Sequence, residues 1–366
     1  MRVYLLVTLI AALVTFLLTP LVRKFAFKAG AVTAVRERDV HTVPTPRLGG
    51  IALWAGMCAA TVLASQIPFL KGLFEVNDGA WVILIAGAMV CLLGVADDIW
   101  DLDWMTKLAG QILAAGFMAW QGVQFTTLPI GGLTIGSSWT FLIITVFIVV
   151  LTMNAVNFVD GLDGLAAGVV AIGGGGFFMY TYLLAKGSSP SDYSSLASLV
   201  IAGLVGACIG FLPHYYHRAR IFMGDSGSML IGLTMSASTI LVTGQIDPES
   251  VPSGGGIPAF IPILLPLAVI VIPLLDMFLA VVRRVKAGNS PFHPDKLHIH
   301  HRLLSLGHSH QNTVLIMYGW SAIFAFGAAS LVVLQWWQSV IFVSIAVLVA
   351  LVITFFPTFK SMRKWS

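Results

Sequence analysis

This chain of 366 residues has a net charge of +4. It is 58% hydrophobic and only 10% charged, and these two fractions lie far outside the composition of soluble globular proteins. Its mean hydropathy of +0.92 likewise excludes a soluble enzyme and predicts an integral membrane protein. The three cysteines lie singly inside apolar runs, which indicates core packing rather than a disulfide framework.

Eleven apolar runs approach the roughly 20 residues that a helix needs to span a bilayer. In chain order they lie near residues 3–22, 48–66, 80–96, 107–121, 139–156, 164–185, 196–213, 227–244, 258–282, 313–335 and 338–357. We therefore expect an all-α polytopic membrane protein with ten or eleven transmembrane helices, in which residues 1–366 form a single domain. The first run lacks an A-x-A cleavage site and is followed directly by Arg23 and Lys24, so it is predicted to remain as a span.

Positive charges predict the orientation of these helices. If the first helix begins outside, the segments that face the cytoplasm are 23–47, 97–107, 157–163, 214–226, 283–312 and the tail after 357. All of the 20 Lys and Arg residues except Arg2, Lys71 and Lys186 then lie on the cytoplasmic side, as the positive-inside rule requires. All nine histidines lie there too. On the outer side, alternating apolar residues around Gly131 and Gly132 allow a short hairpin.

The run near 80–96 ends in "GVADDIWDLDW", which places Asp97, Asp98, Asp101 and Asp103 close together. Carboxylates are unfavourable at this end of a helix, where the macrodipole is negative. Their mutual repulsion is relieved mainly by a cation or a basic partner, so we predict a metal or catalytic role, chiefly for Asp97 and Asp98. The alternative is that they are solvated carboxylates that only end the span.

A second polar motif, "NAVNFVDGLDG", ends the run near 139–156. Asn154, Asn157, Asp160 and Asp163 recur every three residues and stay near one helical face. Oxygen ligands of this kind suit Mg²⁺, which takes one or two carboxylates together with substrate phosphates. Capping and turn formation are the alternative, mainly for Asp163.

A third motif, "IFMGDSGSM", opens the run near 227–244 at its cytoplasmic end. The N-terminus of a helix presents backbone N–H groups and binds phosphate readily. Asp225 or Ser226 is alternatively the N-cap of this helix. Phe222 is either a membrane-interface residue or a platform on which a base stacks.

The fourth motif joins "LLDMFLAVVRR" to the loop "SPFHPDKLHIHHRLL". Asp276 lies inside an apolar run, where an ionisable side chain is a functional candidate. Its spacing of seven from Arg283 also allows a structural ion pair. The cytoplasmic loop 283–312 gathers histidines with Lys296 and Arg302 but has no thiolate and no zinc-binding spacing, so anion binding fits better. A solvated basic loop is the alternative.

Together these motifs predict a membrane-surface site for a diphosphate, with carboxylates for Mg²⁺ and cations around the phosphates. A lipid phosphate is a suitable nucleophile for such a site. A secondary transporter is a weaker alternative, because carriers place their sites near the bilayer midplane between repeats. A catalytically inactive scaffold is a third reading.

At these residues the chain strongly resembles the polyprenyl-phosphate N-acetylhexosamine-1-phosphate transferases of the glycosyltransferase 4 family. The family pattern appears in order as "DDIWD" at 97–101, "NAVNFVDGLDG" at 154–164, "FMGDSGS" at 222–228 and "HIHH" at 298–301. With "TPRLGG" at 45–50, the resemblance extends through Arg302. It implies a helical membrane protein with a cytoplasmic active-site cleft.

The resemblance implies transfer of a sugar 1-phosphate from a UDP-sugar to undecaprenyl or decaprenyl phosphate, with Mg²⁺ or Mn²⁺. The expected products are a lipid-linked diphosphate sugar, which begins a cell-wall or surface polysaccharide, and UMP. The expected partners are these two substrates and the membrane, with no nucleic acid and a homodimer left open. The expected location is the bacterial cytoplasmic membrane, with the N-terminus outside and the active site on the cytoplasmic face.

Carried over residue by residue, the resemblance assigns roles to the motif residues. Asp225 with Asn157 would bind the metal. The catalytic group would be Asp97, as the candidate base, with Asp98, Asp160, His298, His300 and His301, the histidines holding the diphosphate. The substrate-binding group would be Asp163 and Phe222 near the uracil, with Arg283, Lys296, Arg302 and Arg47.

The histidine motif indicates a branch of the family. "HIHH" resembles the branch that uses UDP-N-acetylglucosamine, whereas the branch that acts on UDP-N-acetylmuramoyl-pentapeptide usually has three contiguous histidines. Ile299 interrupts such a run here. Eleven spans and a basic tail containing Lys360, Arg363 and Lys364 also favour the N-acetylglucosamine branch.

Overall fold

In a computed structural model, the structure describes residues 1–32, 44–76, 78–126, 129–130, 133–134, 137–188, 194–243, 261–286, 288 and 299–362. The helices are α1 (Arg2–Ala29), α2 (Gly49–Ala64), α3 (Pro68–Val76), α4 (Gly79–Trp100), α5 (Trp104–Trp120), α6 (Ser138–Val159), α7 (Leu165–Ser188), α8 (Leu196–Tyr215), α9 (Gly224–Thr243), α10 (Ile261–Lys286), α11 (Ile299–Ser305), α12 (His310–Val333) and α13 (Trp336–Met362). Two short strands, β1 (Pro129–Ile130) and β2 (Leu133–Thr134), complete the elements.

Each of the eleven predicted runs coincides with one of these helices, so the all-α polytopic architecture is confirmed. Among the described residues, eight helices are long and apolar enough to cross a membrane, or nine if α2 and α3 count as one span bent by 102°. The bend follows Ser65, where α2 ends, and Pro68 then begins α3. Proline suits the first turn of a helix, where its missing N–H costs nothing. The count of eleven spans stays a prediction.

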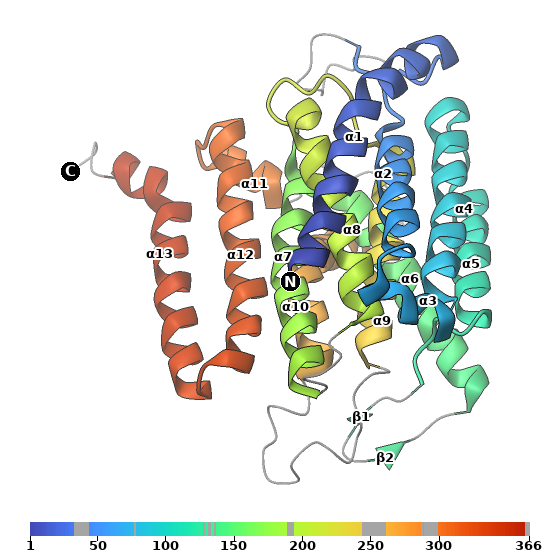
Figure 1. Cartoon of the computed structure of the whole chain (residues 1–366). Helices are drawn as coiled ribbons and strands as arrows, with labels where there is room; N and C mark the ends of the chain where they lie inside the picture. Colours follow the sequence, from blue (N-terminus) through green and yellow to red (C-terminus); the bar gives the residue numbers. More distant parts are fainter. Residues whose placement is uncertain are drawn as a thin grey trace.

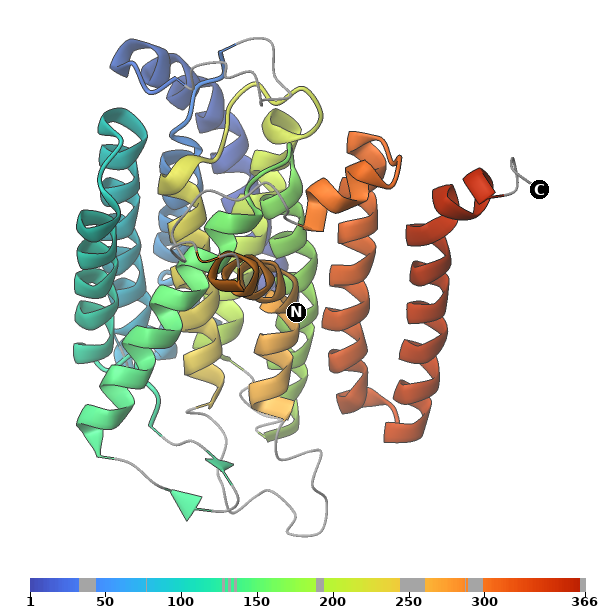
Figure 2. The ribbon, with the colours of Figure 1, turned by 180° about the vertical axis from the view of Figure 1, so that it is seen from behind.

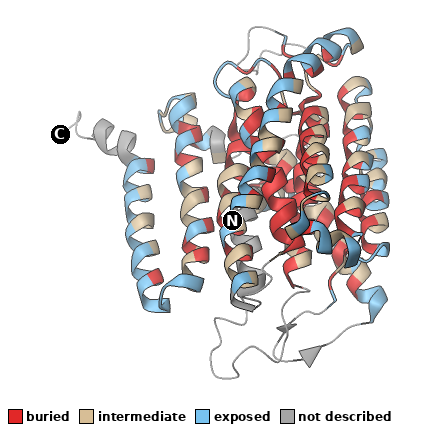
Figure 3. Cartoon of the chain, in the orientation of Figure 1, coloured by how far each residue is buried: buried red, intermediate tan, exposed pale blue. Residues whose placement is uncertain are grey.

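Two helices, α8 and α9, lie at the centre of the bundle. In their most apolar 18-residue windows, 83% of α8 and 89% of α9 residues are buried. Helix α8 packs against α1 and α7, and α9 packs against α4 and α6 (Figure 1). Gly206 and Gly210 let α1 approach α8 closely, since a Cβ at either position would overlap the backbone of α1. The centre is therefore held by close helix packing, as the buried residues in Figure 3 show.

The two ends of the bundle differ in structure. At one end lie β1 and β2, which pair antiparallel through Pro129 with Thr134 and Ile130 with Leu133, as the predicted hairpin requires. At the other end, α4 finishes, α9 begins and α11 precedes α12 (Figure 2). The polar motifs of the sequence therefore meet at one end of the helical bundle.

Candidate active site

Lys107, in the first turn of α5, joins two of the predicted carboxylates. Its Nζ lies 2.6 Å from Asp97 Oδ2 at the end of α4 and 2.9 Å from Asp225 Oδ2 at the start of α9. The Asp97 side chain is 5% exposed and that of Lys107 is 28% exposed. A cation shared by two carboxylates relieves their repulsion. The structure thus brings together residues that are far apart in the sequence.

Asp98 caps a helix other than its own. Its carboxylate oxygens accept the backbone N–H groups of Asp225 at 3.1 Å and Ser226 at 3.3 Å, in the first turn of α9. The positive end of α9 stabilises the buried negative charge of Asp98. The alternative that Asp225 or Ser226 is the N-cap of α9 is wrong, because both residues lie inside the first turn of the helix and Asp98 of α4 accepts their N–H groups. These two N–H groups donate to Asp98, whereas the sequence suggested that they bind phosphate.

Two glycines make this contact between α4 and α9 possible. A Cβ on Gly94 would overlap the backbone of Ser226, and a Cβ on Gly224 would overlap the Asp98 carboxylate. Gly224 also has a positive φ of 70°, which side chains rarely adopt. Small residues at these positions let the carboxylate reach the N-terminus of α9.

The asparagines of the second motif bond across the bundle from α6. Asn157 Nδ2 donates to Asp225 Oδ1 at 3.0 Å and to Ser228 Oγ at 2.9 Å. One turn earlier, Asn154 Nδ2 donates to Oε1 of the buried Gln111 at 2.8 Å. These bonds explain why amides occur inside an apolar run, since buried polar groups need partners. Asn157 and Lys107 therefore hold the Asp225 carboxylate from two different helices.

Asp160, which caps the C-terminal end of α6, accepts a hydrogen bond from the Tyr215 hydroxyl at the end of α8. The same hydroxyl lies 3.2 Å from the Leu162 carbonyl oxygen. Burial raises the pKa of Asp160 to about 7, and the hydrogen bond from Tyr215 opposes this rise. Arg47 also lowers the pKa of Asp160, so its positive charge acts on the same site. Burial at this position therefore favours the protonated form of Asp160.

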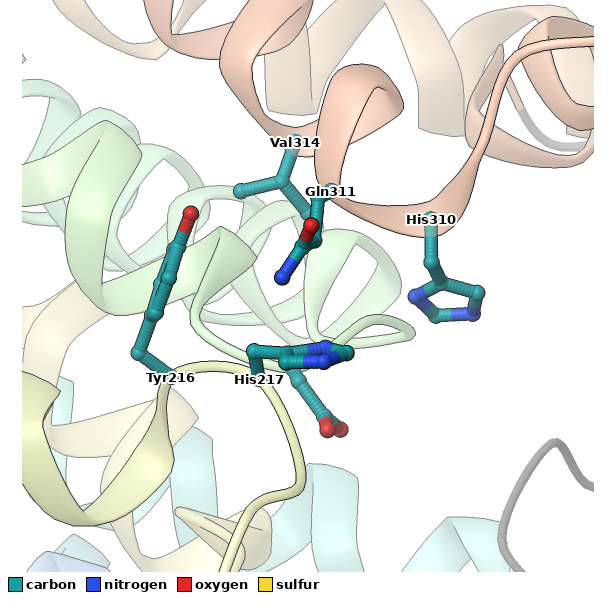
Figure 4. Close-up of a pocket in the computed structure, with 6 residues that line it drawn as sticks. Tyr216, His217, His310, Gln311 and Val314 are labelled. Carbon is teal, nitrogen blue, oxygen red and sulfur yellow. The ribbon is translucent and has the colours of Figure 1, made fainter.

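Asp163 is buried and its Oδ2 accepts the backbone N–H of Ala219 at 2.9 Å. Beside it lies a small, partly open hollow that is lined by Asp163, Tyr216, His217, His310, Gln311 and Val314. Figure 4 shows Tyr216 and His217, which follow α8, facing residues at the start of α12. This hollow has room for no more than about one water-sized group, and the predicted role of Asp163 near the uracil stays a prediction.

Asp101 and Asp103 have structural roles, as their secondary ranking in the sequence suggested. Asp101 ends α4 in the left-handed conformation, with a φ of 53°. Asp103 is the N-cap of α5, and its carboxylate accepts the N–H groups of Met105 and Thr106 at 2.9 and 3.0 Å. These hydrogen bonds and one from the Thr106 hydroxyl lower the pKa of Asp103. Both residues shape the turn that directs Lys107 toward α9.

The segment "TPRLGG" lies alongside the third motif. Phe222 N–H donates to the Pro46 carbonyl at 2.8 Å, and the Phe222 carbonyl accepts the N–H of Gly49 at 3.1 Å. Arg47 is held in between through its own N–H, which donates to the Ala31 carbonyl at 2.9 Å. Arg47 and Phe222 therefore belong to one connected edge of the site, and the predicted contact of Phe222 with uracil stays a prediction.

The basic loop is described only in part. His298 and Lys296 lie outside the described residues, as do the side chains of His300 and His301, although the backbone of both histidines belongs to α11. Arg283 is half-buried on α10, and Arg302 is exposed on α11. The predicted roles of these six residues in binding the diphosphate stay predictions.

Asp97, Asp225 and Asn157 lie close together and are the candidates for binding a divalent cation. Within the part of the chain that the structure describes, no group of three or more His, Cys, Asp and Glu side chains could hold a metal ion. Asp97 and Asp225 nevertheless share a cationic partner, and Asn157 lies beside Asp225. Mg²⁺ is commonly bound by one or two carboxylates with substrate phosphates as further ligands. Asp97 and Asp225 supply two carboxylates of the kind that such an ion uses, and the assignment of Asp225 with Asn157 to the metal stays a prediction.

Two residues of this site were missed by the sequence reasoning, Lys107 and Tyr215. Lys107 lies in the first turn of α5, where a positive charge is unfavourable beside the positive end of the helix. Asp97 is likewise unfavourable at the end of α4, because the C-terminal end of a helix is negative. The two side chains form an ion pair in the structure. A lysine at the start of one helix, shortly after acids at the end of the preceding helix, could therefore have indicated this ion pair from the sequence. Tyr215 has no comparable signal.

Comparison with known proteins supports one family. Residues 80–243 match the profile of Glycosyl transferase family 4. A decaprenyl-phosphate N-acetylglucosaminephosphotransferase of Mycolicibacterium smegmatis is 43% identical over 97% of this chain and 88% of the relative. A probable undecaprenyl-phosphate N-acetylglucosaminyl 1-phosphate transferase of Bacillus subtilis is 32% identical over 93% and 88%. A phospho-N-acetylmuramoyl-pentapeptide-transferase of Desulforudis audaxviator is 29% identical over 81% and 90%.

Proposed function

Because the chain belongs to the polyprenyl-phosphate sugar-1-phosphate transferases of glycosyl transferase family 4, we propose that it makes a polyprenyl diphosphate N-acetylglucosamine. The substrates are UDP-N-acetylglucosamine and undecaprenyl or decaprenyl phosphate, and the second product is UMP. The observation that carries this proposal is that Asp97, Asn157 and Asp225, from three separate motifs, meet near Lys107. The lysine bonds both carboxylates, and Asn157 bonds Asp225. Transfer of a phosphoryl group depends on charged groups that are held in place around the phosphates, and this arrangement supports it.

The proposed reaction forms and breaks one phosphorus–oxygen bond each. An oxygen of the lipid phosphate attacks the phosphorus that carries the sugar, and the bridging oxygen of the diphosphate leaves with UMP. A phosphate monoester is already largely ionised at neutral pH, so the reaction does not require a base. Asp97 accepts bonds from Lys107 and from the N–H of Leu102 at 2.9 Å. It therefore suits the orientation of Lys107 better than proton abstraction.

Lys107 and Asp225 act together in this scheme. The Lys107 ammonium is partly exposed and lies close enough to Asp97 and Asp225 to stabilise negative charge that develops on a neighbouring phosphate. A Mg²⁺ or Mn²⁺ ion bound at Asp225 would neutralise charge on the diphosphate. Asp160 and Arg47 border the same site, and the basic residues of 283–312 are proposed to hold the diphosphate.

The proposed orientation places the N-terminus outside and the site at the cytoplasmic face of a bacterial membrane. In this orientation, all Lys and Arg residues except Arg2, Lys71 and Lys186 lie on the cytoplasmic side. Membrane proteins typically gather their positive charges on that side. A UDP-sugar is water-soluble, whereas a polyprenyl phosphate stays in the bilayer. A site at the membrane surface gives access to both substrates.

The phospho-N-acetylmuramoyl-pentapeptide reaction is less well supported. Two relatives named for that reaction are 29% identical over 81% of this chain and 34% identical over 63% of it, against 43% over 97% for a relative named for N-acetylglucosamine. The interrupted histidine motif "HIHH" favours the same choice.

The test is release of UMP by the purified protein in detergent with polyprenyl phosphate and Mg²⁺. UDP-N-acetylglucosamine, UDP-N-acetylgalactosamine and UDP-N-acetylmuramoyl-pentapeptide are compared as donors. We expect release with UDP-N-acetylglucosamine that depends on both the lipid and the metal. Release with the pentapeptide donor alone would contradict the choice of sugar, and no release from folded protein with any donor would contradict the reaction.

A further inference from the structure

Asp276 is a fully buried carboxylate in α10, with 0% of its side chain exposed. Burying a carboxylate is costly unless hydrogen bonds compensate for the lost water. Its Oδ1 accepts the backbone N–H of Ile299 at 2.7 Å, 23 residues further along the chain. The spacing of seven residues between Asp276 and Arg283 suggested an ion pair within α10 and gave no indication of this hydrogen bond. This hydrogen bond ties Asp276 of α10 to the first residue of α11.

The side chain of Ile299 provides a second attachment. Ile299 packs against a hydrophobic cluster that is separate from the main core and that includes Leu303 of α11. The same cluster contains Leu162 and Leu165, which flank Asp163, and Val314 of α12. The start of α11 is therefore held against the segment that carries Asp160 and Asp163, as well as against α10.

These two attachments meet at one residue inside the histidine motif. Ile299 lies between His298 and His300 and directly precedes the pair His300 and His301. Its N–H is bonded to Asp276 and its side chain is in the apolar cluster. A histidine at position 299 would place a polar ring in that cluster. This packing explains why an isoleucine, and not a histidine, suits position 299.

We propose that Asp276 is a positioning residue for the transferase reaction, which acts by anchoring Ile299 and so placing His300 and His301 at the diphosphate. This inference rests on the proposed function. Helix α11 has seven residues, and isolated helices of that length are unstable in water. The placement of its histidines consequently depends on contacts with α10 and with the apolar cluster. Misplacing a binding group by about 1 Å can cost about 100-fold in rate.

The test combines variants of Asp276 with removal of the histidines. Asp276→Leu removes the acceptor, Asp276→Asn keeps an acceptor oxygen at the same position, and His300→Ala with His301→Ala removes the groups that Asp276 is proposed to place. We expect Asp276→Leu to lower kcat/KM for the UDP-sugar by about 100-fold and Asp276→Asn to restore most of this loss. The affinity for UDP, measured by calorimetry without turnover, should fall in the same order.

The decisive comparison is made in the histidine-free background. If Asp276 acts through the histidines, Asp276→Leu should there lower UDP affinity by less than about threefold, because the effects of residues that act as a unit do not add. Equal losses with and without the histidines would overturn the proposal. Wild-type affinity of Asp276→Leu for UDP would also overturn it. Failure of the wild-type protein to release UMP would contradict the proposed function and leave the binding comparison intact.

Thr19→Val is the matched control for loss of a buried polar side chain. Thr19 is fully buried in α1, and its hydroxyl donates to the Thr15 carbonyl in the same helix. We expect this variant to keep wild-type kcat/KM and UDP affinity. The melting temperature of every variant in detergent separates lost positioning from lost folding. A fall in UDP affinity of Thr19→Val equal to that of Asp276→Leu would show a general packing effect and overturn the proposal.

Discussion

Helices α9 and α13 differ most clearly in what surrounds them. In their apolar windows, 89% of residues are buried in α9 but only 11% in α13. Helix α9 lies among α4, α6 and α8, whereas α13 packs mainly on α12 at the edge of the molecule (Figure 1). A helix that is apolar all round is stable in either setting when lipid surrounds the protein. Helix α9 has neighbouring helices that supply partners for the Asp225 carboxylate at its start.

Asp225→Asn should have the largest effect, because it removes the carboxylate at the centre of the network of α9. Asp225 accepts bonds from Lys107 and Asn157. We expect UMP release to fall by about 1,000-fold, the upper range for loss of one electrostatic contact in an active site. The melting temperature should stay near that of the wild type, because an amide fills the same space. Unchanged metal-dependent turnover would contradict the assignment of Asp225.

Lys107→Met should have the next largest effect. It leaves Asp97 and Asp225 without their shared cation, so we expect UMP release to fall about 100-fold. Without metal the melting temperature should fall by a few degrees, since one partner of a partly buried ion pair has been removed.

Added Mg²⁺ should restore more thermal stability to Lys107→Met than to the wild type, because a divalent cation can replace the ammonium. Lys107→Arg is the matched control that keeps the positive charge. A melting temperature of Lys107→Met that does not respond to Mg²⁺ would show that the two carboxylates do not form the cation site.

Tyr215→Phe should shift the pH dependence of the reaction. The Tyr215 hydroxyl lowers the pKa of Asp160, which burial raises to about 7. Without the hydroxyl, the pKa rises further and less of Asp160 is ionised at neutral pH. If the ionised form is required, the acid limb of kcat/KM, which reports the free enzyme, moves to higher pH. Tyr318→Phe removes a hydroxyl that donates to the Gly164 carbonyl and should leave that limb unchanged.

Ile345→Ala on α13 should have the smallest effect. Ile345 is 58% exposed in the structure, and lipid tails are as apolar as the side chain that they contact. We expect unchanged kcat/KM and a change in melting temperature of less than about 1 °C. A loss of activity comparable to that of Tyr215→Phe would show that α13 packs against another protein surface in the membrane.

The fold was largely predictable because the bilayer imposes a simple rule. Each apolar run of suitable length became a helix, including the runs that became α4, α6 and α9. The division of α2 from α3 by a bend of 102° was not predictable from apolar content. The bend depends on a local break that a count of hydrophobic residues does not detect.

Most residues of the candidate site could be identified from the sequence, but the hydrogen bonds and ion pairs between them could not. Asp97, Asp98, Asn157 and Asp225 were all identified from motifs, and the structure brings them together. The sequence could not show that Asp98 caps α9, because the two residues that it contacts are more than 120 positions away.

Composition and motif spacing alone determined that this chain is a helical membrane protein with its reactive side chains on one face. Hydropathy is a local property, and each helix satisfies its own backbone hydrogen bonds. Only the tertiary structure decided that Lys107 joins Asp97 to Asp225 and that Asp276 holds Ile299. These pairings depend on which helices pack together and how closely, and the glycines at α4 and α9 permit that approach only when both helices are in place.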